Sequence, residues 1–361
     1  MKIIYRHIFY ELIKFTFLAL LSVVTIYLLI DLFEELSYFT SRKVPLLVLF
    51  RYYCYSLPNA ITLLYPVSLI LAVFVVYGQM TRDNEISALK SAGVKIYRLF
   101  LPGIIIGGGT GIFYLLGSEF ITIPFNRRFS DLRRYVIEKR SAPVEERRVD
   151  VYRVDGNRVF WAREWKKTNE KSTLKNLLLL ELDRERRVIR RIDGETATYY
   201  NGRWFGSKFV QREFLPDDRE IFKSVEEGEI SGLNFSPDEW LLPMRPVEET
   251  STLLLRRYIS KMKNAGENVA QEEVEYHYRF SYALIGLIVV LLGLPLSVKL
   301  RRGGVMLGLG LGLLFSFLYW GAIQTCRAFG GAHVISPVLS AWLPNMIFGF
   351  GAIILLLKVE R

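Results

Sequence analysis

The sequence contains only two cysteines and three histidines, and their spacing excludes several kinds of site. Cys54 and Cys326 lie in no C-x-x-C motif and have no histidine beside them, so two isolated core thiols are favoured over a bridge between them. His7, His277 and His333 match no metal-binding or catalytic-triad spacing. We therefore expect no metal ion, no cofactor and no catalytic residue.

A nucleotide-binding loop is also missing. No G-x-x-x-x-G-K-[ST] motif occurs anywhere in the chain. The glycine-rich stretch at residues 107–111 lies inside an apolar segment and does not follow a strand, so it is not a phosphate loop. We expect a chain without an ATPase site of its own.

Apolar residues, by contrast, make up 51% of the 361 residues and occur in long runs. A helix needs about 20 such residues to cross the hydrocarbon core of a membrane. Six segments satisfy this, at roughly 12–32, 57–79, 99–118, 279–298, 305–326 and 335–357. The first is too long for the core of a signal peptide and no small-residue cleavage site follows it, so we expect it to be retained.

The net charge of +11 is unevenly distributed along the chain. Residues 119–278 contain 30 Lys and Arg against 29 Asp and Glu, whereas the remainder contains 17 against 7. This basic excess in the membrane part argues for membrane topology and against nucleic-acid binding. Because the basic residues gather in short segments on one side, the positive-inside rule places both termini in the cytoplasm and residues 119–278 outside.

Between residues 149 and 214 the apolar pattern changes to a period of two, which indicates β-strands. Short strands are expected around an Asp155-Gly156 turn and onwards, at 149–154, 157–163, 174–183, 186–193, 195–200, 203–206 and 208–214. Residues 215–248 are expected to return the chain with one or two further strands. This spacing favours an all-β sandwich, a jelly roll or an open barrel.

Two helices are expected after the strands. The stretch 250–266 has a Thr or Ser cap and Gly266 as its stop, and 269–280 leads into the fourth span. The expected fold is thus a membrane α-helical protein of six transmembrane helices with an inserted extracytoplasmic all-β, jellyroll-like domain. Its parts are spans one to three (1–118), the β domain with connecting helices (119–278) and spans four to six (279–361).

Glycines recur every four residues in two of the spans. They are Gly103, Gly107 and Gly111 in the third span, and Gly304, Gly308 and Gly312 in the fifth. Such spacing is typical of closely packed transmembrane helices, and we favour this interpretation. A helix contact that slides or opens during function is a refinement of it.

A short charged segment, residues 81–93, separates the second and third spans. Thr81 or Asp83 is a plausible cap for a helix, and Gly93 is placed as its stop. Asp83 and Glu85 lie in the first turn, where the helix dipole favours negative charge.

The faces of this helix differ in polarity. Ile86 and Leu89 form an apolar stripe, whereas Arg82, Glu85 and Lys90 point in other directions. A helix this short needs a surface on which to dock. Lipid headgroups are one candidate, but an anionic leaflet would repel the acidic first turn. We therefore expect a protein partner in the cytoplasm.

Three stretches carry a resemblance to a known family. They are LPNAITLLYPVSLILAVFVVYGQMTRDNEISALKSAGV, LLRRYISKMKNAGENVAQEEVEYHYRFSYALIGLIVVLLGLPLS and ISPVLSAWLPNMIFGFGAIILL. In their order and spacing, and in the R-x-x-E-I-x-A-L-x-x-x-G core, they resemble the LptF/LptG (YjgP/YjgQ) permeases over essentially the whole chain. These are the membrane subunits of the lipopolysaccharide exporter. The end of the fourth span and the last span lean towards LptG.

The resemblance implies a permease subunit of an ABC-type exporter in the bacterial inner membrane, which extracts lipopolysaccharide and passes it to a periplasmic bridge. The implied partners are a cytoplasmic LptB-like ATPase dimer, a second permease subunit (a paralogue or an identical copy) and an LptC/LptA-like bridge protein. The resemblance also implies an inner lipid cavity with lateral gates built from the first and fifth spans.

The same resemblance implies that residues 81–93 form a coupling helix seated in a groove of the ATPase. The family's acidic coupling residue falls on Glu85. The residues expected at this contact are Arg82, Asp83, Glu85, Ile86, Leu89, Lys90 and Gly93.

The sequence departs from the family at the outer end of the first span. LptG members carry lysines there that are thought to meet lipid phosphates, whereas this chain has Asp31, Glu34 and Glu35, with Arg42 and Lys43 further on. No phosphate-binding role is carried over, and the lipid-contacting residues are left open.

Two other functions stay open at this point. One is a mechanotransmission or signalling protein that uses an ATPase without moving lipid. The other is a membrane-bound lipid-modifying enzyme, which would need convergent polar residues that the sequence does not show.

Overall fold

The computed structural model describes residues 2–139, 145–155, 157–168, 171–183, 185, 187–215, 219–230, 232–233, 246–264, 268–299 and 304–359. The chain divides into two compact units. A helical unit consists of Met1–Lys139, Pro246–Arg256 and Ala270–Arg361, and a sheet unit consists of Arg140–Arg245 and Arg257–Val269. The α-helical membrane fold with an inserted β domain is thereby confirmed.

Five described helices of the helical unit are long and apolar enough to cross a membrane. They are α1 (Lys2–Ser41), α2 (Leu46–Arg82), the stretch Ile96–Ile137, α10 (Gly304–Gly331) and α11 (Pro337–Leu357). The stretch Ile96–Ile137 consists of α4 (Ile96–Gly117), η1 (Ser118–Thr122), α5 (Ile123–Asp131) and η2 (Leu132–Ile137). The expected domain boundary at residues 118/119 falls inside this stretch, whereas the helical unit continues to Lys139.

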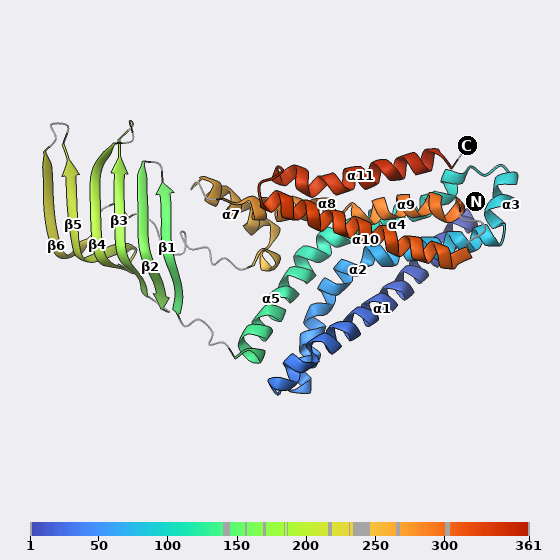
Figure 1. Ribbon diagram of the computed structural model, residues 1–361, viewed down its shortest axis with the longest axis horizontal. Helices are drawn as coiled ribbons and strands as arrows, with labels where there is room; N and C mark the ends of the chain where they lie inside the picture. Colours follow the sequence, from blue (N-terminus) through green and yellow to red (C-terminus); the bar gives the residue numbers. More distant parts are fainter. Residues whose placement is uncertain are drawn as a thin grey trace. The chain divides into compact units, whose positions relative to one another are not determined.

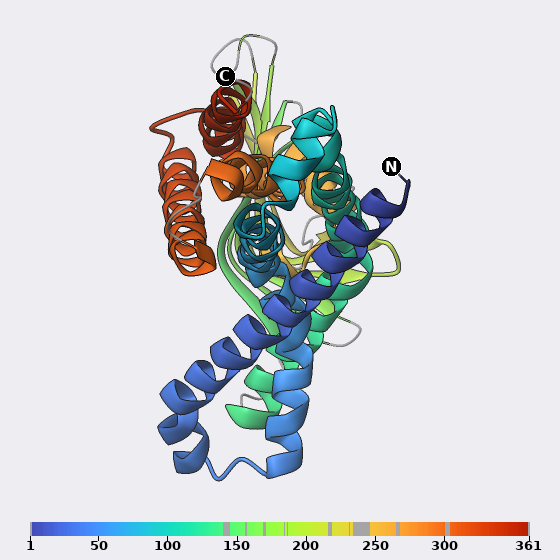
Figure 2. The ribbon, with the colours of Figure 1, turned by 90° about the vertical axis from the view of Figure 1, so that its right-hand side faces the viewer.

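The helices α1 and α2 extend well beyond the expected spans. Only residues 42–45 separate them, so most of the segment 31–56 is helical, as Figure 2 shows for this hairpin. Buried Phe39 and Tyr52 pack together at this end, with ring centroids 5.2 Å apart. This contact stabilises the ends of both helices, so that they continue past the expected apolar spans.

The fourth expected span is interrupted. α8 (Ala270–Tyr282) and α9 (Ile285–Lys299) meet at an angle of 47° and count as a sixth span only if taken together. The expectation of one uninterrupted helix over 279–298 is therefore wrong. At the break the carbonyl of Ser281 accepts hydrogen bonds from the backbone N–H of Leu284 and from Asn345 Nδ2. These bonds replace the regular helical pattern without leaving the carbonyl unpaired.

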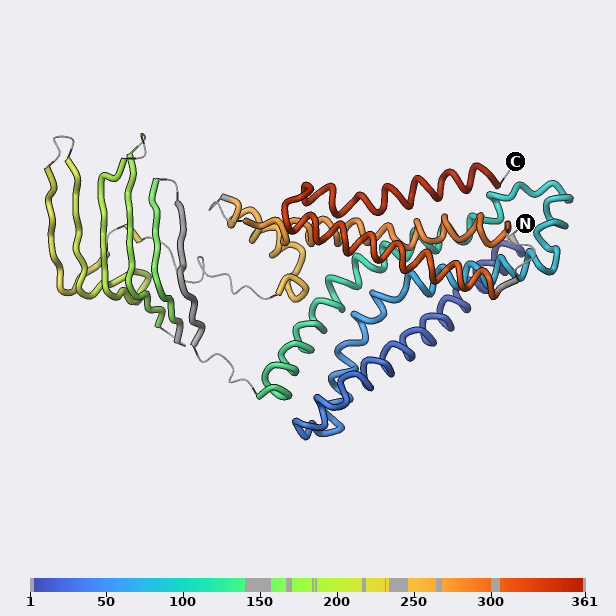
Figure 3. Tube along the Cα trace, viewed as in Figure 1, coloured from blue at the N-terminus to red at the C-terminus, as the bar shows by residue number. Residues whose placement is uncertain are grey.

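The two ends of the helical unit differ in what they carry. The N-terminus, the C-terminus and α3 (Glu85–Ser91) lie at one end of this unit (Figures 1 and 3). The end of η2 lies at the opposite end, together with the 42–45 loop (Figure 3). The apolar core between these ends joins residues of α1, α2, α4 and α9, and includes Ile8, Leu12, Val73, Tyr77, Leu99 and Val290.

The sheet unit contains six antiparallel strands in sequential order, as Figure 1 shows. They are β1 (Glu145–Asp155), β2 (Arg158–Thr168), β3 (Lys171–Leu182), β4 (Val188–Tyr200), β5 (Arg203–Phe214) and β6 (Glu220–Glu229). β1 ends and β2 begins around the expected turn, of which Gly156 lies outside the described residues. The expected strand pairs 186–193/195–200 and 203–206/208–214 each form one strand, β4 and β5.

A line of skipped pairs crosses the whole sheet at one level. In each of the five ladders one opposed pair at this level is not formed, and the residues concerned are Asp150, Arg163, Asn176, Glu195, Lys208 and Glu226. Asn176 and Lys208 adopt left-handed backbone angles there, with φ of 49° and 50°. Such residues bend strands locally. The expected strand ends at 193/195 and 206/208 are therefore wrong, because β4 and β5 each continue through them.

The inner face of the sheet is apolar and buried. Its largest fully buried side chains are Trp165, Trp204, Leu174 and Leu179, and they belong to one core with Ile192 and Phe209. Buried residues recur at every second position of β3 on either side of Asn176, at Ser172 and Leu174 and again at Leu177 and Leu179. This alternation is the sequence period of two that predicted the β domain.

Outside the strands, α7 (Thr252–Asn264) begins where expected. Ser251 Oγ accepts the backbone N–H of Leu254 at 3.4 Å, in the manner of an N-cap. The expected stop at Gly266 lies outside the described residues.

Candidate functional site

The charged segment between the second and third spans forms a helix shorter than expected. α3 covers only Glu85–Ser91, and Thr81 and Arg82 belong to α2 instead. The hydroxyl of Thr81 donates to the Tyr77 carbonyl at 2.7 Å within α2, so it does not cap α3. The residue before α3 is Asn84, which adopts a left-handed conformation with φ of 58° and makes no side-chain cap.

The C-terminal end of α3 follows the sequence expectation more closely. Gly93 has φ of +81°, a conformation that favours glycine and ends the helix. Its backbone N–H donates to the Lys90 carbonyl at 3.0 Å. Asp83 does not cap α3 either, because its backbone N–H closes the end of α2 on Gln79 and its carboxylate pairs with Arg82 at 3.1 Å.

The apolar stripe of α3 packs on the chain's own helices. Ile86 is only 3% exposed and belongs to the core that includes Ile8 and Leu12 of α1 and Met80 of α2. Leu89 packs against the same core from a half-buried position. The charged residues Arg82, Asp83, Glu85 and Lys90 are exposed. The stripe therefore holds α3 on its own protein, and the charged face is presented to the surroundings.

The third-span glycines lie against α9 and the break before it. A methyl group on Gly107 would lie 3.0 Å from the carbonyl oxygen of Gly286, and one on Gly111 would overlap the carbonyl oxygen of Ala283. Gly103 faces Leu294 and Val290 at 3.4 Å. The missing side chains thus allow the two backbones to approach closely.

The fifth-span glycines lie against α2 instead. A methyl group on Gly308 would lie 2.8 Å from the ring of Phe74, and one on Gly312 would lie 3.1 Å from it. Gly304 is the first residue of α10, and its contacts lie outside the described part of the chain. The two glycine rows therefore serve different helix pairs, α4 with α9 and α10 with α2.

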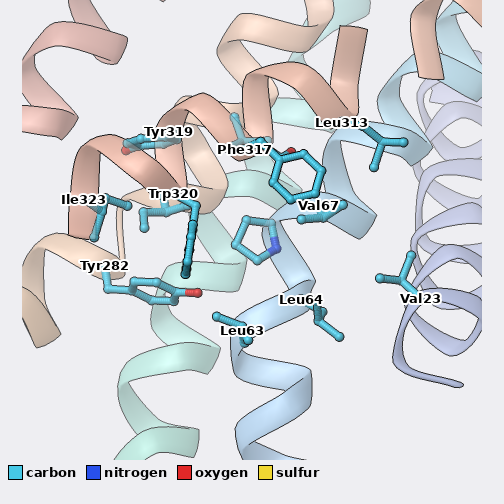
Figure 4. A pocket seen from close by; sticks show the side chains of 14 residues that line it. Val23, Leu63, Leu64, Val67, Tyr282, Leu313, Phe317, Tyr319, Trp320 and Ile323 are labelled. Atoms are coloured by element: carbon cyan, nitrogen blue, oxygen red, sulfur yellow. The ribbon is translucent and has the colours of Figure 1, made fainter. Parts of the chain in front are cut away.

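An apolar pocket of about 280 Å³ lies between α1, α2, α8, α9 and α10. Figure 4 shows the rings of Phe317 and Trp320 from α10 around the same space as Leu63 and Leu64 from α2, with Val23 of α1 at one side. Its polar groups are few, among them the hydroxyls of Tyr282, Ser316 and Tyr319. Such a lining suits hydrocarbon and offers little to a polar substrate.

The carboxylates at the far end of α1 are engaged within the chain. Glu35 accepts a hydrogen bond from the Tyr52 hydroxyl at 3.1 Å and lies 3.5 Å from Arg133. Asp31 accepts from the Tyr53 hydroxyl at 3.1 Å. Glu34, between them, is exposed. This arrangement explains how α1 carries three acidic residues past its apolar stretch without a break.

Two polar networks in the helical unit were not predicted from the sequence. One joins Tyr319, Asn345 and the Ser281 carbonyl, and the other joins Glu119, Thr252 and Arg279. Their members are 26 to 133 residues apart along the chain. The one usable signal was a lone Asn or Arg in or beside an apolar span, where a polar side chain needs a partner.

The remaining candidates show no assembled reaction centre. Among the described residues, no group of three or more His, Cys, Asp or Glu side chains could hold a metal ion. Cys54 and Cys326 are both free thiols.

Comparison with protein families identifies this arrangement. The family model described as "Lipopolysaccharide export system permease LptF/LptG" matches residues 6–358, nearly the whole chain. A comparison with curated proteins found no match. The matched region includes both units, and its apolar helices are those of a multi-pass inner-membrane protein. The chain belongs to the LptF/LptG family of lipopolysaccharide export permeases.

Proposed function

We propose that this permease extracts lipopolysaccharide from the inner membrane and passes it to a periplasmic bridge, driven by a separate cytoplasmic ABC ATPase. Both termini and α3 are on the cytoplasmic side, and the sheet unit is periplasmic. The excess of Lys and Arg in the short segments beside the spans supports this orientation. The partners are an LptB-like ATPase dimer, a second permease subunit and an LptC/LptA-like bridge protein.

The observation that carries the proposal is the way in which α3 is attached to the membrane helices. Ile86 fixes this helix to a core that contains residues of α1, α2, α4 and α9. Only residues 83–84 separate α3 from α2, and residues 92–95 separate it from α4. A displacement of α3 by an ATPase is therefore transmitted directly to the second and third spans.

The exposed charges of α3 supply the contact. Glu85 is exposed at the first turn of α3, and Lys90 is exposed at its last turn. A groove with basic and polar groups on the ATPase would complement Glu85, and closure of the ATPase dimer on ATP would move the seated helix. The resulting shift of the spans narrows a cavity between two permease subunits and pushes lipid towards the sheet unit.

The pocket beside α1 and α10 fits the lipid side of the mechanism. Its lining is almost wholly apolar, as acyl chains require. It joins the first span with the fifth, the two spans that would form a lateral gate with the second subunit. The buried apolar face of the sheet then offers the next apolar surface for the lipid.

The experiment is a charge reversal in the reconstituted complex. Glu85→Lys should abolish ATP-dependent export while the complex remains folded, because a lysine would meet the groove that accommodates a carboxylate. Glu226→Lys, an equal charge reversal at an exposed residue of β6, is the matched control and should export normally. Export by Glu85→Lys at the wild-type rate would contradict the proposal.

A signalling protein coupled to an ATPase is the second candidate. The attachment of α3 to the membrane helices suits signalling equally, because transmission of movement does not require a lipid. The apolar pocket and the apolar sheet interior favour transport. A lipid-crosslinking experiment separates the two.

A further inference from the structure

A second, polar cavity of about 300 Å³ lies in the helical unit, between α1, α2, α5, η2 and η3 (Val247–Glu249). Its lining includes the side chains of Asp31, Asn59, Asn126, Arg134 and Glu249. It differs from the apolar pocket in both residues and chemistry, and neither export nor coupling uses it. Its charges indicate what it binds.

Glu249 is the buried carboxylate of this cavity. The residue is 2% exposed, and its Oε1 accepts a hydrogen bond from an Arg134 guanidinium nitrogen at 3.3 Å. Its Oε2 is buried and has no hydrogen-bond partner among the described residues. Because burying a carboxylate oxygen without a donor is costly, a positive charge in the adjoining cavity would stabilise this carboxylate.

The cavity also carries more negative than positive charge. Asp31 and Glu248 line it with Glu249, and Arg134 is the one cation among its described lining residues. Asp31 accepts a hydrogen bond from the neutral Tyr53 hydroxyl, which leaves its charge uncompensated. The nearby Arg133 is occupied by Glu35 and Glu138 at 3.5 and 3.6 Å, and Arg127 donates to the Glu249 backbone carbonyl.

These groups favour an organic cation over a metal ion. No described cluster has the three carboxylate, His or Cys ligands that would hold a metal. Asn59 and Asn126 add neutral oxygens, which accept hydrogen bonds from an ammonium group. An anionic phosphate alone would meet a net negative lining and be repelled.

The surroundings of Asp31 on α1 indicate an amphiphile. Ile26, Ile30 and Phe33 on the same helix are large, apolar and 53–70% exposed. A ligand with a polar head in the cavity can thus lay its acyl chains along α1. We propose that this cavity binds the primary ammonium group of a lipid headgroup, with Asp31 as its acceptor and the buried charge of Glu249 stabilising it from behind.

The acidic residues at this end of the first span then contribute to ligand binding. Whereas LptG members carry lysines there, this chain offers carboxylates to an amine-bearing head. The site goes beyond the proposed export function, because it requires only that the helical unit lies in a membrane. Binding can be measured without ATP and without transport.

The test compares two lipids on the full-length chain, purified in mild detergent with its co-purifying subunits. Phosphatidylethanolamine and phosphatidylcholine share the phosphate but differ in a primary against a quaternary ammonium, which donates no hydrogen bond. Native mass spectrometry should show about tenfold preferential retention of phosphatidylethanolamine, the size expected for one charge-assisted hydrogen bond. Equal retention of the two lipids would overturn the proposal.

Variants locate the binding site. Asp31→Asn and Glu249→Gln should each remove most of the preference, because each deletes one carboxylate charge and keeps the side-chain shape. Glu34→Gln, an exposed carboxylate of the same helix outside the cavity, should retain it. If Glu249→Gln fails to fold, Asp31→Asn alone decides, and an unchanged preference in that variant refutes the assignment.

Soluble competitors identify the source of the ammonium group. If ethanolamine at millimolar concentration does not displace the lipid, the site recognises the ammonium group as part of a lipid headgroup. Displacement by ethanolamine alone assigns the same chemistry to a free amine. Displacement by magnesium chloride, at constant ionic strength and without effect of ethanolamine, would show an inorganic cation site and overturn the proposal.

Discussion

Tyr319 donates its hydroxyl to Asn345 Oδ1 at 2.6 Å, and Asn345 Nδ2 donates to the Ser281 carbonyl, also at 2.6 Å. The three groups come from α10, α11 and the last turn of α8, so one asparagine joins three membrane helices where the α8/α9 span breaks. Asn345 and Tyr319 are both buried. This contact stabilises the bent span by giving the Ser281 carbonyl a second donor in addition to the Leu284 N–H.

Replacing Asn345 should therefore destabilise the helical unit. Asn345→Leu leaves both the Ser281 carbonyl and the Tyr319 hydroxyl without this partner, and we expect a loss of about 1–2 kcal/mol in the free energy of unfolding. Tyr319→Phe removes only one of the two bonds and should cost less. Denaturant unfolding in detergent measures both, with the exposed Met346→Leu as the neutral control. An Asn345→Leu protein as stable as the wild type would show that the bend does not depend on this contact.

The glycines of α4 provide a comparison within one helix. Gly107→Ala and Gly111→Ala place a methyl group against the backbone of residues 283–287, and should each cost about 1–3 kcal/mol through overpacking. Gly108 and Gly109 have nothing within 4 Å of an added methyl group. Alanine there should be neutral, or stabilising by about 0.5–1 kcal/mol through helix propensity. Thermal unfolding of the four variants tests this, and equal effects at all four positions would refute close packing of α4 on α9.

A polar network ties the segment 246–256 to the membrane helices. Glu119 accepts hydrogen bonds from the backbone and hydroxyl of Thr252, and buried Arg279 donates to the same hydroxyl at 3.0 Å and to the Val247 carbonyl at 2.7 Å. Thr252→Val keeps the side-chain shape and removes the hydroxyl. We expect a loss of about 1–3 kcal/mol and faster proteolysis within 246–256, because partners of buried charged groups are lost. Thr252→Ser should restore the wild-type behaviour, and a Val variant that resists protease like the wild type would contradict this role.

Ile86 and Glu85 should have separable effects on α3. Ile86→Ala removes a fully packed side chain, and should cost about 2–4 kcal/mol of local stability and accelerate amide hydrogen exchange in residues 85–91. Glu85→Lys changes an exposed residue and should leave that exchange unchanged while it abolishes export. Slow, wild-type exchange in the Ile86→Ala protein would show that α3 is held by something other than this core.

The sequence predicted the architecture because its strongest signals are local. Apolar length, charge distribution and a period of two led to the membrane helices and the β domain, which the family match and the structure confirm. Gly93 was placed as a helix stop and has the positive φ that such a stop uses.

The errors arose where a distant residue decides a local conformation. The expected first span ended at about residue 32, but Tyr53, Tyr52 and Arg133 provide partners for Asp31 and Glu35 that allow the helix to continue. At the break at 283–284 the Ser281 carbonyl accepts a hydrogen bond from Asn345, which lies 64 residues away. Neither pairing can be predicted from the local sequence.

Thr81 shows a different limit. A threonine beside a helix boundary can cap the next helix or bond back to the preceding turn, and its type alone does not distinguish the two. Here its hydroxyl bonds to Tyr77, so α3 begins four residues later than expected. The buried, unpartnered oxygen of Glu249 likewise follows only from the packing of η3.

The most direct test of the central claim is photocrosslinking from the sheet interior in the reconstituted complex. A photoreactive amino acid at Ile192, which is buried in the apolar face, should form lipopolysaccharide adducts only when ATP is supplied. The same group at exposed Glu195 of the same strand should form few. ATP-dependent adducts at residue 192 alone are the predicted result. Their absence, or equal yield with and without ATP, would contradict ATP-driven export through this permease.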